Sequence, residues 1–247
     1  MNNHVIWLDK ITMGDVDKVG GKNASLGGLI NELAAEKILV PAGFATTVHA
    51  YNEFLSQNNL KQQITSRLDA LDVNNLPELS KAADAIQALI NDAELPPKLI
   101  AEIKTALATL QATDDYLSVA VRSSATNEDL DNASFAGQQK TLLNIEGLDQ
   151  VLLAVKKVYA SLYSERAISH RDHHGHEDAC MAVGIQKMVR SDTGSAGVMF
   201  TLDTESGFDQ VVFITSAFGL GESVVQGQVN PDEFYVHKAS LQAGRPA

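Results

Sequence analysis

The chain has 247 residues, of which 45% are apolar and 20% are charged. This composition is that of an ordinary globular protein, and it excludes disordered and collagen-like chains. The length allows one large domain or two small ones. The formal net charge of −12 argues against a nucleic-acid partner, because such a partner requires a basic surface. An acidic protein that binds an anionic ligand must instead gather its few cations at one site.

The first 112 residues are predicted to be mainly helical. In chain order the expected elements are a strand at 5–8, a glycine-rich turn at 19–23, a helix at 24–35, a helix capped by Thr47, and helices within 76–110 that are interrupted at Pro96 and Pro97. Apolar residues recur at helical spacing in each expected helix. We therefore expect this part to pack as helices around a small amount of sheet.

The pattern changes to mixed strand and helix after Asp114. Strands are expected at 116–121, 138–145, 182–189, 195–201, 211–216 and 233–236, with a helix at 148–168. We predict an α/β (α+β) fold with two parts. Residues 1–112 form the mainly helical part, and residues 113–247 form the mixed part.

A single cysteine, Cys180, excludes an intrachain disulfide and fits a reducing compartment. The N-terminal residues lack the basic and apolar regions of a signal peptide. No apolar run approaches the length of a membrane span. We therefore expect a cytoplasmic protein whose partners include neither a membrane nor a nucleic acid.

Gly20-Gly21-Lys22 precedes the first expected helix. Glycines let backbone N–H groups approach a phosphate, the start of a helix favours an anion, and Lys22 adds a charge. The segment is not a Walker A loop, because Val16 and Asn23 stand where that motif needs glycine and a hydroxyl residue. A glycine turn beside a solvated lysine is the alternative, and on this feature alone it is the stronger one.

Arg122 directly follows an apolar strand and precedes a run of small residues. A guanidinium group at a strand end can clamp phosphate oxygens. An ion pair with Glu128 or Asp129 would explain the arginine equally well. The local sequence does not choose between these interpretations.

Two glycine-containing segments are weaker candidates. The loop at 132–141 could fold over a nucleotide as a lid, or it could be a plain junction between a loop and a strand. Gly219 and Gly221 lack the third glycine of a dinucleotide fingerprint, since Val224 occupies that position. Glu222 could orient a cation or cap a helix.

A histidine-rich segment covers residues 170–178. Histidines and carboxylates at this density can bind a transition metal, but their spacing matches no standard site. A solvated helix end is the favoured interpretation. We therefore assign no metal ligands within the chain.

Several segments, in this order, resemble the nucleotide-binding domain of the dikinase family. They are Val-Gly-Gly-Lys-Asn-Ala-Ser-Leu-Gly, Pro-Ala-Gly-Phe-Ala-Thr-Thr, Val-Arg-Ser-Ser-Ala-Thr-Asn-Glu-Asp-Leu and Ala-Ser-Phe-Ala-Gly-Gln-Gln. That family includes pyruvate phosphate dikinase, phosphoenolpyruvate synthase and rifampicin phosphotransferase. The runs at 185–192, 197–207 and 224–234 are most similar to the phosphoenolpyruvate synthase branch. The resemblance covers essentially the whole chain.

The resemblance implies an ATP-grasp fold, incomplete in this chain, that binds ATP together with Mg²⁺. It implies that Lys22 and Arg122 contact the phosphates, that Gly137 lies in the covering loop, and that Thr141 lies on the strand behind it. The residues implied to lie beside the adenine are Gln186, Lys187, Met188 and Val189. Glu222 completes the expected ATP-binding residues.

The resemblance also implies functions that this chain does not carry. In the family, ATP phosphorylates a histidine on a separate swivelling domain, releasing AMP and phosphate, and the histidine then phosphorylates pyruvate at a third domain. We expect that histidine, the pyruvate site and the acidic strand for magnesium to lie beyond this sequence, which reads as truncated. No catalytic residue is therefore assigned here.

Several points stay open at the level of the sequence. The oligomeric state is one, and a homodimer of the full-length enzyme is an option. A sibling dikinase with a different acceptor and a non-enzymatic interaction module are the alternative functions.

Overall fold

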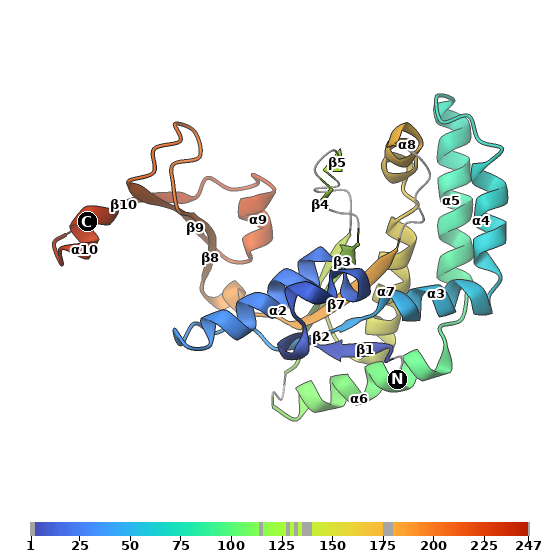
Figure 1. Cartoon of the computed structure of the whole chain (residues 1–247), viewed down its shortest axis with the longest axis horizontal. Coiled ribbons are helices and arrows are strands. Elements are labelled where there is room, and N and C mark those ends of the chain that lie inside the picture. The colour runs from blue at the N-terminus through green and yellow to red at the C-terminus, as the bar shows by residue number, and fades with distance from the viewer. Residues whose placement is uncertain are drawn as a thin grey trace. The chain divides into compact units, whose positions relative to one another are not determined.

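The computed structural model describes residues 3–113, 116–126, 129–130, 133–134, 140–174 and 180–246 (Figure 1). The chain forms two compact units, Met1–Met188 and Val189–Ala247. Helices and antiparallel sheets occur together, so the predicted mixed fold class is confirmed. The first unit carries the lysine and arginine that the sequence singles out.

The first unit is built on a five-stranded sheet in the order β1-β2-β7-β3-β6. Its strands are β1 (Val5–Trp7), β2 (Gly43–Thr46), β7 (Met181–Lys187), β3 (Val119–Ala125) and β6 (Thr141–Ile145). Every neighbouring pair is antiparallel. Strands from both predicted parts of the chain therefore share one sheet, and the division at residues 112 and 113 remains a prediction drawn from the change in sequence pattern.

Helices account for most of the remaining described residues of this unit. They are α1 (Val16–Val19), α2 (Gly21–Leu33), α3 (Val48–Gln57), α4 (Leu60–Leu68), α5 (Leu76–Asp92), α6 (Pro97–Gln111), α7 (Leu148–Ser161) and α8 (Glu165–His174). The 3₁₀ turns η1 (Leu8–Lys10) and η2 (Met13–Asp15) precede α1, and the short strands β4 (Asp129–Leu130) and β5 (Ala133–Ser134) pair with each other.

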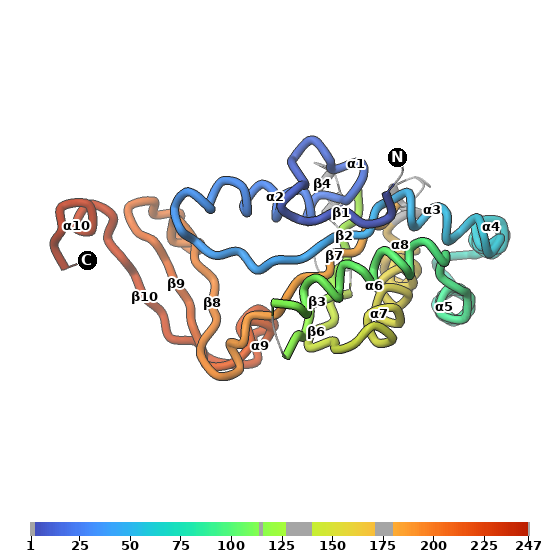
Figure 2. Tube along the Cα trace, turned by 90° about the horizontal axis from the view of Figure 1, so that it is seen from below, coloured from blue at the N-terminus to red at the C-terminus, as the bar shows by residue number. Residues whose placement is uncertain are grey.

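The two faces of the sheet pack differently because side chains alternate along each strand. On β7, Met181, Val183 and Ile185 join a large apolar cluster with α3, α5, α6 and α7. The residue between the first two, Ala182, joins a smaller cluster with residues of η1 and α2. Figure 2 shows α2 and α7 on opposite sides of the strands.

Small residues let α2 approach the sheet closely. A Cβ atom at Gly184 would collide with the side-chain oxygen of Asn23, and one at Gly20 would collide with the Ser124 carbonyl oxygen. Gly20 also has a φ of 78°, which favours glycine. The start of α2 therefore lies against β3 and β7.

The prediction of one continuous helix over 148–168 is wrong, because the structure has two helices there. α7 ends at Ser161, and α8 begins at Glu165. The Ser161 hydroxyl donates back to the Val158 carbonyl, and the Ser164 hydroxyl accepts from the Ala167 amide, as an N-cap does. Serine hydroxyls thus satisfy backbone groups at the break.

The second unit contains a three-stranded antiparallel sheet in the order β10-β9-β8. Its strands are β8 (Ser195–Phe200), β9 (Val211–Phe218) and β10 (Asp232–His237), and its helical segments are η3 (Ser191–Thr193), α9 (Gly221–Val225) and α10 (Lys238–Gln242). The rings of Phe213 and Tyr235 pack across β9 and β10 with centroids 4.8 Å apart.

Candidate functional site

A pocket of about 250 Å³ lies in the first unit, where α2 meets the small-residue face of the sheet. It is lined by Leu8, Lys22, Asn23, Ser25, Leu26, Leu29, Arg122, Ser123, Gly184 and Gln186. Lys22 and Arg122 are 100 positions apart in the sequence, and they line the same pocket as predicted. Three leucines give part of the wall an apolar character.

Lys22 belongs to the first turn of α2, which begins at Gly21. Gly20 separates α1 from α2 as a single junction residue, so the predicted glycine turn is shorter than expected. Backbone N–H groups at a helix start leave a partial positive charge there. The lysine and the helix start together make this wall of the pocket electropositive.

Arg122 is the exposed residue of β3, whose other six members are buried. It pairs with Thr141 of β6 on one side and with Gly184 of β7 on the other. A charged side chain in the middle of a buried strand is costly to place unless its face remains open to solvent or to a ligand. Arg122 meets this condition because its side chain lines the pocket.

Asn23 and Ser124 hold the two cationic elements together. The Asn23 amide donates to the Ser124 hydroxyl over 3.1 Å, and the Asn23 side chain donates to the Val19 carbonyl over 2.9 Å. Both residues are buried. Sequence reasoning missed this link, although the asparagine after the lysine and the serines after Arg122 were signals for it.

The other predicted site residues are placed differently. Gln186 lines the pocket, and its side-chain amide donates to the Pro41 carbonyl over 3.0 Å. Thr141 lies directly across the sheet from Arg122 and is exposed. Lys187 pairs with Val119, so strand alternation places it on the opposite face from Arg122. The Met188 amide donates to the Ser118 carbonyl over 2.9 Å.

The last three predicted residues are outside the described part of the first unit. Val189 and Glu222 belong to the second unit, where a Glu222 carboxylate oxygen accepts from the Gln226 side chain over 2.9 Å. Gly137 lies outside the described residues, as do Glu128 and the side chain of Asp129, the alternative partners of Arg122. The side chains of His173, His174 and His176 are also outside the described part.

The charge of the pocket decides what it can hold. The described residues that line it include a lysine and an arginine and no carboxylate. Such a site suits an anion with several oxygens, since guanidinium and ammonium groups bind phosphate oxygens. Mg²⁺ prefers carboxylate oxygens, so these residues do not fit a magnesium site.

A second pocket, of about 630 Å³, lies between α5, α6 and α7. It is larger, but its wall carries the carboxylates of Asp92, Glu94 and Asp149. Its lysine, Lys156, donates to the carbonyl groups of Asn91 and Ala93. Because like charges repel, this pocket is the poorer one for a polyphosphate.

The described helices include none that is both long and apolar enough to cross a membrane.

Comparison with known proteins gives one family and a consistent set of relatives. Residues 16–246 match the family described as pyruvate phosphate dikinase, AMP/ATP-binding domain. The chain is 57% identical to phosphoenolpyruvate synthase of Pseudomonas aeruginosa, in an alignment that covers 100% of this chain and 32% of that protein. It is 56% identical to the Escherichia coli enzyme of that name over 98% of this chain and 31% of that protein.

The relative from Neisseria meningitidis, also a phosphoenolpyruvate synthase, is 55% identical and is covered over 32% of its length. The chain therefore spans about a third of the length of the curated relatives it matches. Since the family match extends over nearly all of the sequence, the chain belongs to the pyruvate phosphate dikinase AMP/ATP-binding domain family.

Proposed function

We propose that the pocket between α2 and the sheet holds the phosphate groups of ATP, with Lys22 and Arg122 as its main cationic contacts. The observation that carries this proposal is the meeting of both cations on a wall whose described residues include no carboxylate. The Arg122 guanidinium can donate two parallel hydrogen bonds to phosphate oxygens. Lys22 adds a point charge where the start of α2 already attracts anions.

The remaining predicted contacts are part of the same proposal. Thr141 and Gln186 have support from the geometry, since one faces Arg122 across the sheet and the other lines the pocket. Lys187 ends β7, Met188 ends the first unit and Val189 begins the second, and we propose that these three residues lie beside the adenine. Gly137 and Glu222 complete the set, and an ATP-grasp fold is proposed with it.

For the whole protein we propose the activity named for its relatives, phosphoenolpyruvate synthase. All three relatives described above carry that name, which disfavours rifampicin phosphotransferase as the alternative. The membership in a nucleotide-binding family disfavours a non-enzymatic module. The phosphohistidine, the pyruvate site and the ligands of Mg²⁺ would belong to the two thirds of the relatives' length outside this chain, in a cytoplasmic enzyme.

Calorimetric titration with ATP tests the proposal. Arg122→Ala and Lys22→Ala should each weaken binding at least about tenfold, because a hydrogen bond to a charged group contributes about 1.5–3 kcal/mol. Arg67→Ala is the matched control, since Arg67 is exposed and donates to the Gln63 carbonyl within α4. This control should bind ATP within about twofold of the unmodified chain.

Folding of each variant is checked by circular dichroism before the titration. If folded Arg122→Ala and Lys22→Ala chains bind ATP as tightly as the Arg67→Ala chain, the pocket is not the phosphate site.

A further inference from the structure

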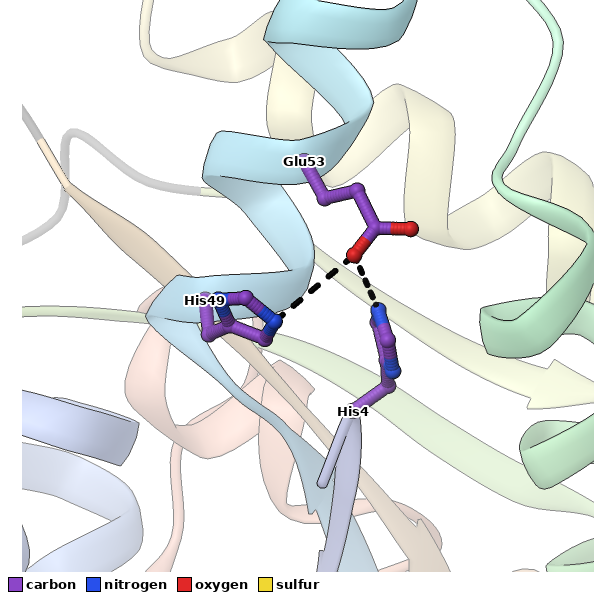
Figure 3. A group of neighbouring side chains, drawn as sticks. All are labelled: His4, His49 and Glu53. Carbon is purple, nitrogen blue, oxygen red and sulfur yellow. Dashed lines mark hydrogen bonds and ion pairs between the residues drawn. The ribbon is translucent and has the colours of Figure 1, made fainter. Parts of the chain in front are cut away.

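His4, His49 and Glu53 converge at a place outside the pocket described above (Figure 3). One ligand atom from each residue lies within 4.8 Å of the others. His4 Nε2 is 2.9 Å from Glu53 Oε2, and His49 Nε2 is 3.6 Å from the same oxygen. The sequence pattern did not single out this group, because its members come from two distant segments.

The backbone fixes the positions of all three residues. His4 directly precedes β1, and its carbonyl accepts from the Thr47 amide over 2.9 Å. Thr47 caps α3, accepting from the Ala50 amide over 3.2 Å. His49 and Glu53 stand one turn apart on that helix, so they share a face. The fold therefore brings the three residues together.

The spacing suits a small divalent ion with nitrogen and oxygen ligands. Bonds of about 2.0–2.1 Å in a tetrahedral zinc site place neighbouring donor atoms about 3.3 Å apart. The two separations from Glu53 Oε2, 2.9 Å and 3.6 Å, lie on either side of that value. Two imidazoles and one carboxylate are ligands that zinc accepts readily.

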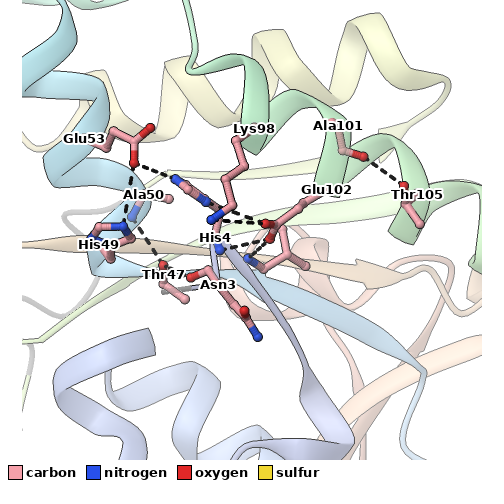
Figure 4. A network of polar contacts seen from close by, with 11 residues as sticks. Asn3, His4, Thr47, His49, Ala50, Glu53, Lys98, Ala101, Glu102 and Thr105 are labelled. Carbon is pink, nitrogen blue, oxygen red and sulfur yellow. Dashed lines mark hydrogen bonds and ion pairs between the residues drawn. The ribbon is translucent and has the colours of Figure 1, made fainter. Parts of the chain in front are cut away.

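A second observation comes from the other nitrogen of His4. The His4 side chain is 1% exposed, and Nδ1 has no hydrogen-bond partner among the described residues. Glu102 Oε1 lies 3.7 Å from it, while Glu102 Oε2 accepts from the His4 and Val5 amides over 2.9 Å each (Figure 4). A neutral ring that donates from Nε2 to Glu53 would turn an Nδ1 lone pair toward this carboxylate.

A metal ion bound to Nε2 removes this repulsion between the His4 Nδ1 lone pair and the Glu102 carboxylate. The proton then resides on Nδ1 and faces Glu102, which is the carboxylate–histidine–metal arrangement found around bound metal ions. The group also holds two carboxylates, Glu53 and Glu102, against one ammonium, that of Lys98, which lies 3.9 Å from Glu102. With neutral imidazoles the cluster is net negative, and a cation is favoured there.

We propose that His4 Nε2, His49 Nε2 and Glu53 Oε2 form a binding site for a divalent transition metal, with Zn²⁺ as the ion. Glu102 is a positioning residue that orients His4. His49 and Glu53 are 42% and 39% exposed, so the ion can enter from that side and keep water as a further ligand. The bound ion would fasten the start of the sheet to α3.

Titration of the metal-free chain with Zn²⁺, under chelator competition, tests the site. The chain carries His173→Gln, His174→Gln and His176→Gln throughout, so that the histidine-rich segment does not contribute. We expect one bound ion per chain. His49→Ala and Glu53→Gln should each weaken binding at least tenfold, since even a change in the outer shell costs about 10–100-fold.

Two further variants make the test specific. His237→Ala, at a histidine whose ring hydrogen-bonds with the Ser240 hydroxyl in the second unit, should bind Zn²⁺ like the parent. Glu102→Gln should keep the stoichiometry of one ion with about 10-fold lower affinity. Zinc should raise the melting temperature of the parent and of His237→Ala, and at the same zinc concentration it should raise that of His49→Ala by less.

A proton is the competing occupant, because a doubly protonated His4 would pair with both carboxylates without any metal. Absence of stoichiometric zinc binding in the parent would overturn the proposal. Zinc binding that His49→Ala and Glu53→Gln leave unchanged would overturn it equally.

Discussion

Gly27 and Gly28 are neighbours on α2, but a methyl group would meet different surroundings at the two positions. At Gly27 it would collide with the Ile11 carbonyl oxygen and Cβ, whereas at Gly28 it would find only Met13 Cγ, at 3.8 Å. Gly27 is therefore required for the close packing of α2 that places Lys22. Gly28 only adds backbone freedom, which must be lost on folding.

Alanine at these two positions should change stability in opposite directions. Gly27→Ala should lower the free energy of unfolding by about 1–3 kcal/mol, the usual cost of overpacking. Gly28→Ala should raise it by about 0.5–1 kcal/mol. Urea unfolding monitored by circular dichroism measures both. Equal effects of the two substitutions would show that Gly27 does not pack against Ile11 as described.

Among the helices and strands, the sequence predicted the helix boundaries that depend on contacts between residues close together in the chain. The Thr47 cap of α3 is confirmed, and the break at Pro96 and Pro97 separates α5 from α6 as expected. Strand β2 was missed, because Pro41 and Gly43 indicate a turn, while its pairing with β1 and β7 comes from distant segments. Helix α4 was missed as well.

Thr46 shows how such distant pairing is completed. It is fully buried at the end of β2, and its hydroxyl accepts from the Val183 amide of β7 over 3.0 Å. The Tyr159 hydroxyl lies 3.5 Å from the Thr46 hydroxyl, and burial raises the pKa of Tyr159 so that its hydroxyl stays neutral. A side chain thus continues the hydrogen bonding between β2 and β7.

Thr46→Val keeps the shape of the side chain but removes this acceptor. It should destabilise the chain by about 1–3 kcal/mol, the cost of a buried amide without a partner. Thr46→Ser keeps the hydroxyl and loses one methyl group, which costs about 1 kcal/mol. Chemical denaturation compares the two. A valine variant that is as stable as the serine variant would contradict a structural role for the hydroxyl.

For the whole molecule, the fold class and the two cationic residues could be predicted from the sequence. The residues of α2 and β3 that form the pocket wall between those cations could not. Lys22 and Arg122 were visible as single charges beside small residues. The roles of Asn23 and Ser124 depend on α2 lying against β3, which is tertiary information. The cluster of His4 with α3 was invisible for the same reason. The net charge of −12 likewise conceals a locally cationic pocket.

Amide chemical-shift mapping by NMR with the ¹⁵N-labelled chain shows whether ATP phosphates bind between α2 and β3. We expect added ATP to shift the amides of Lys22, Asn23, Arg122, Ser123 and Gln186, and Arg122→Ala to suppress these shifts. Shifts confined to the acidic pocket between α5, α6 and α7, with the amides around Lys22 and Arg122 unchanged, would contradict the proposed phosphate site.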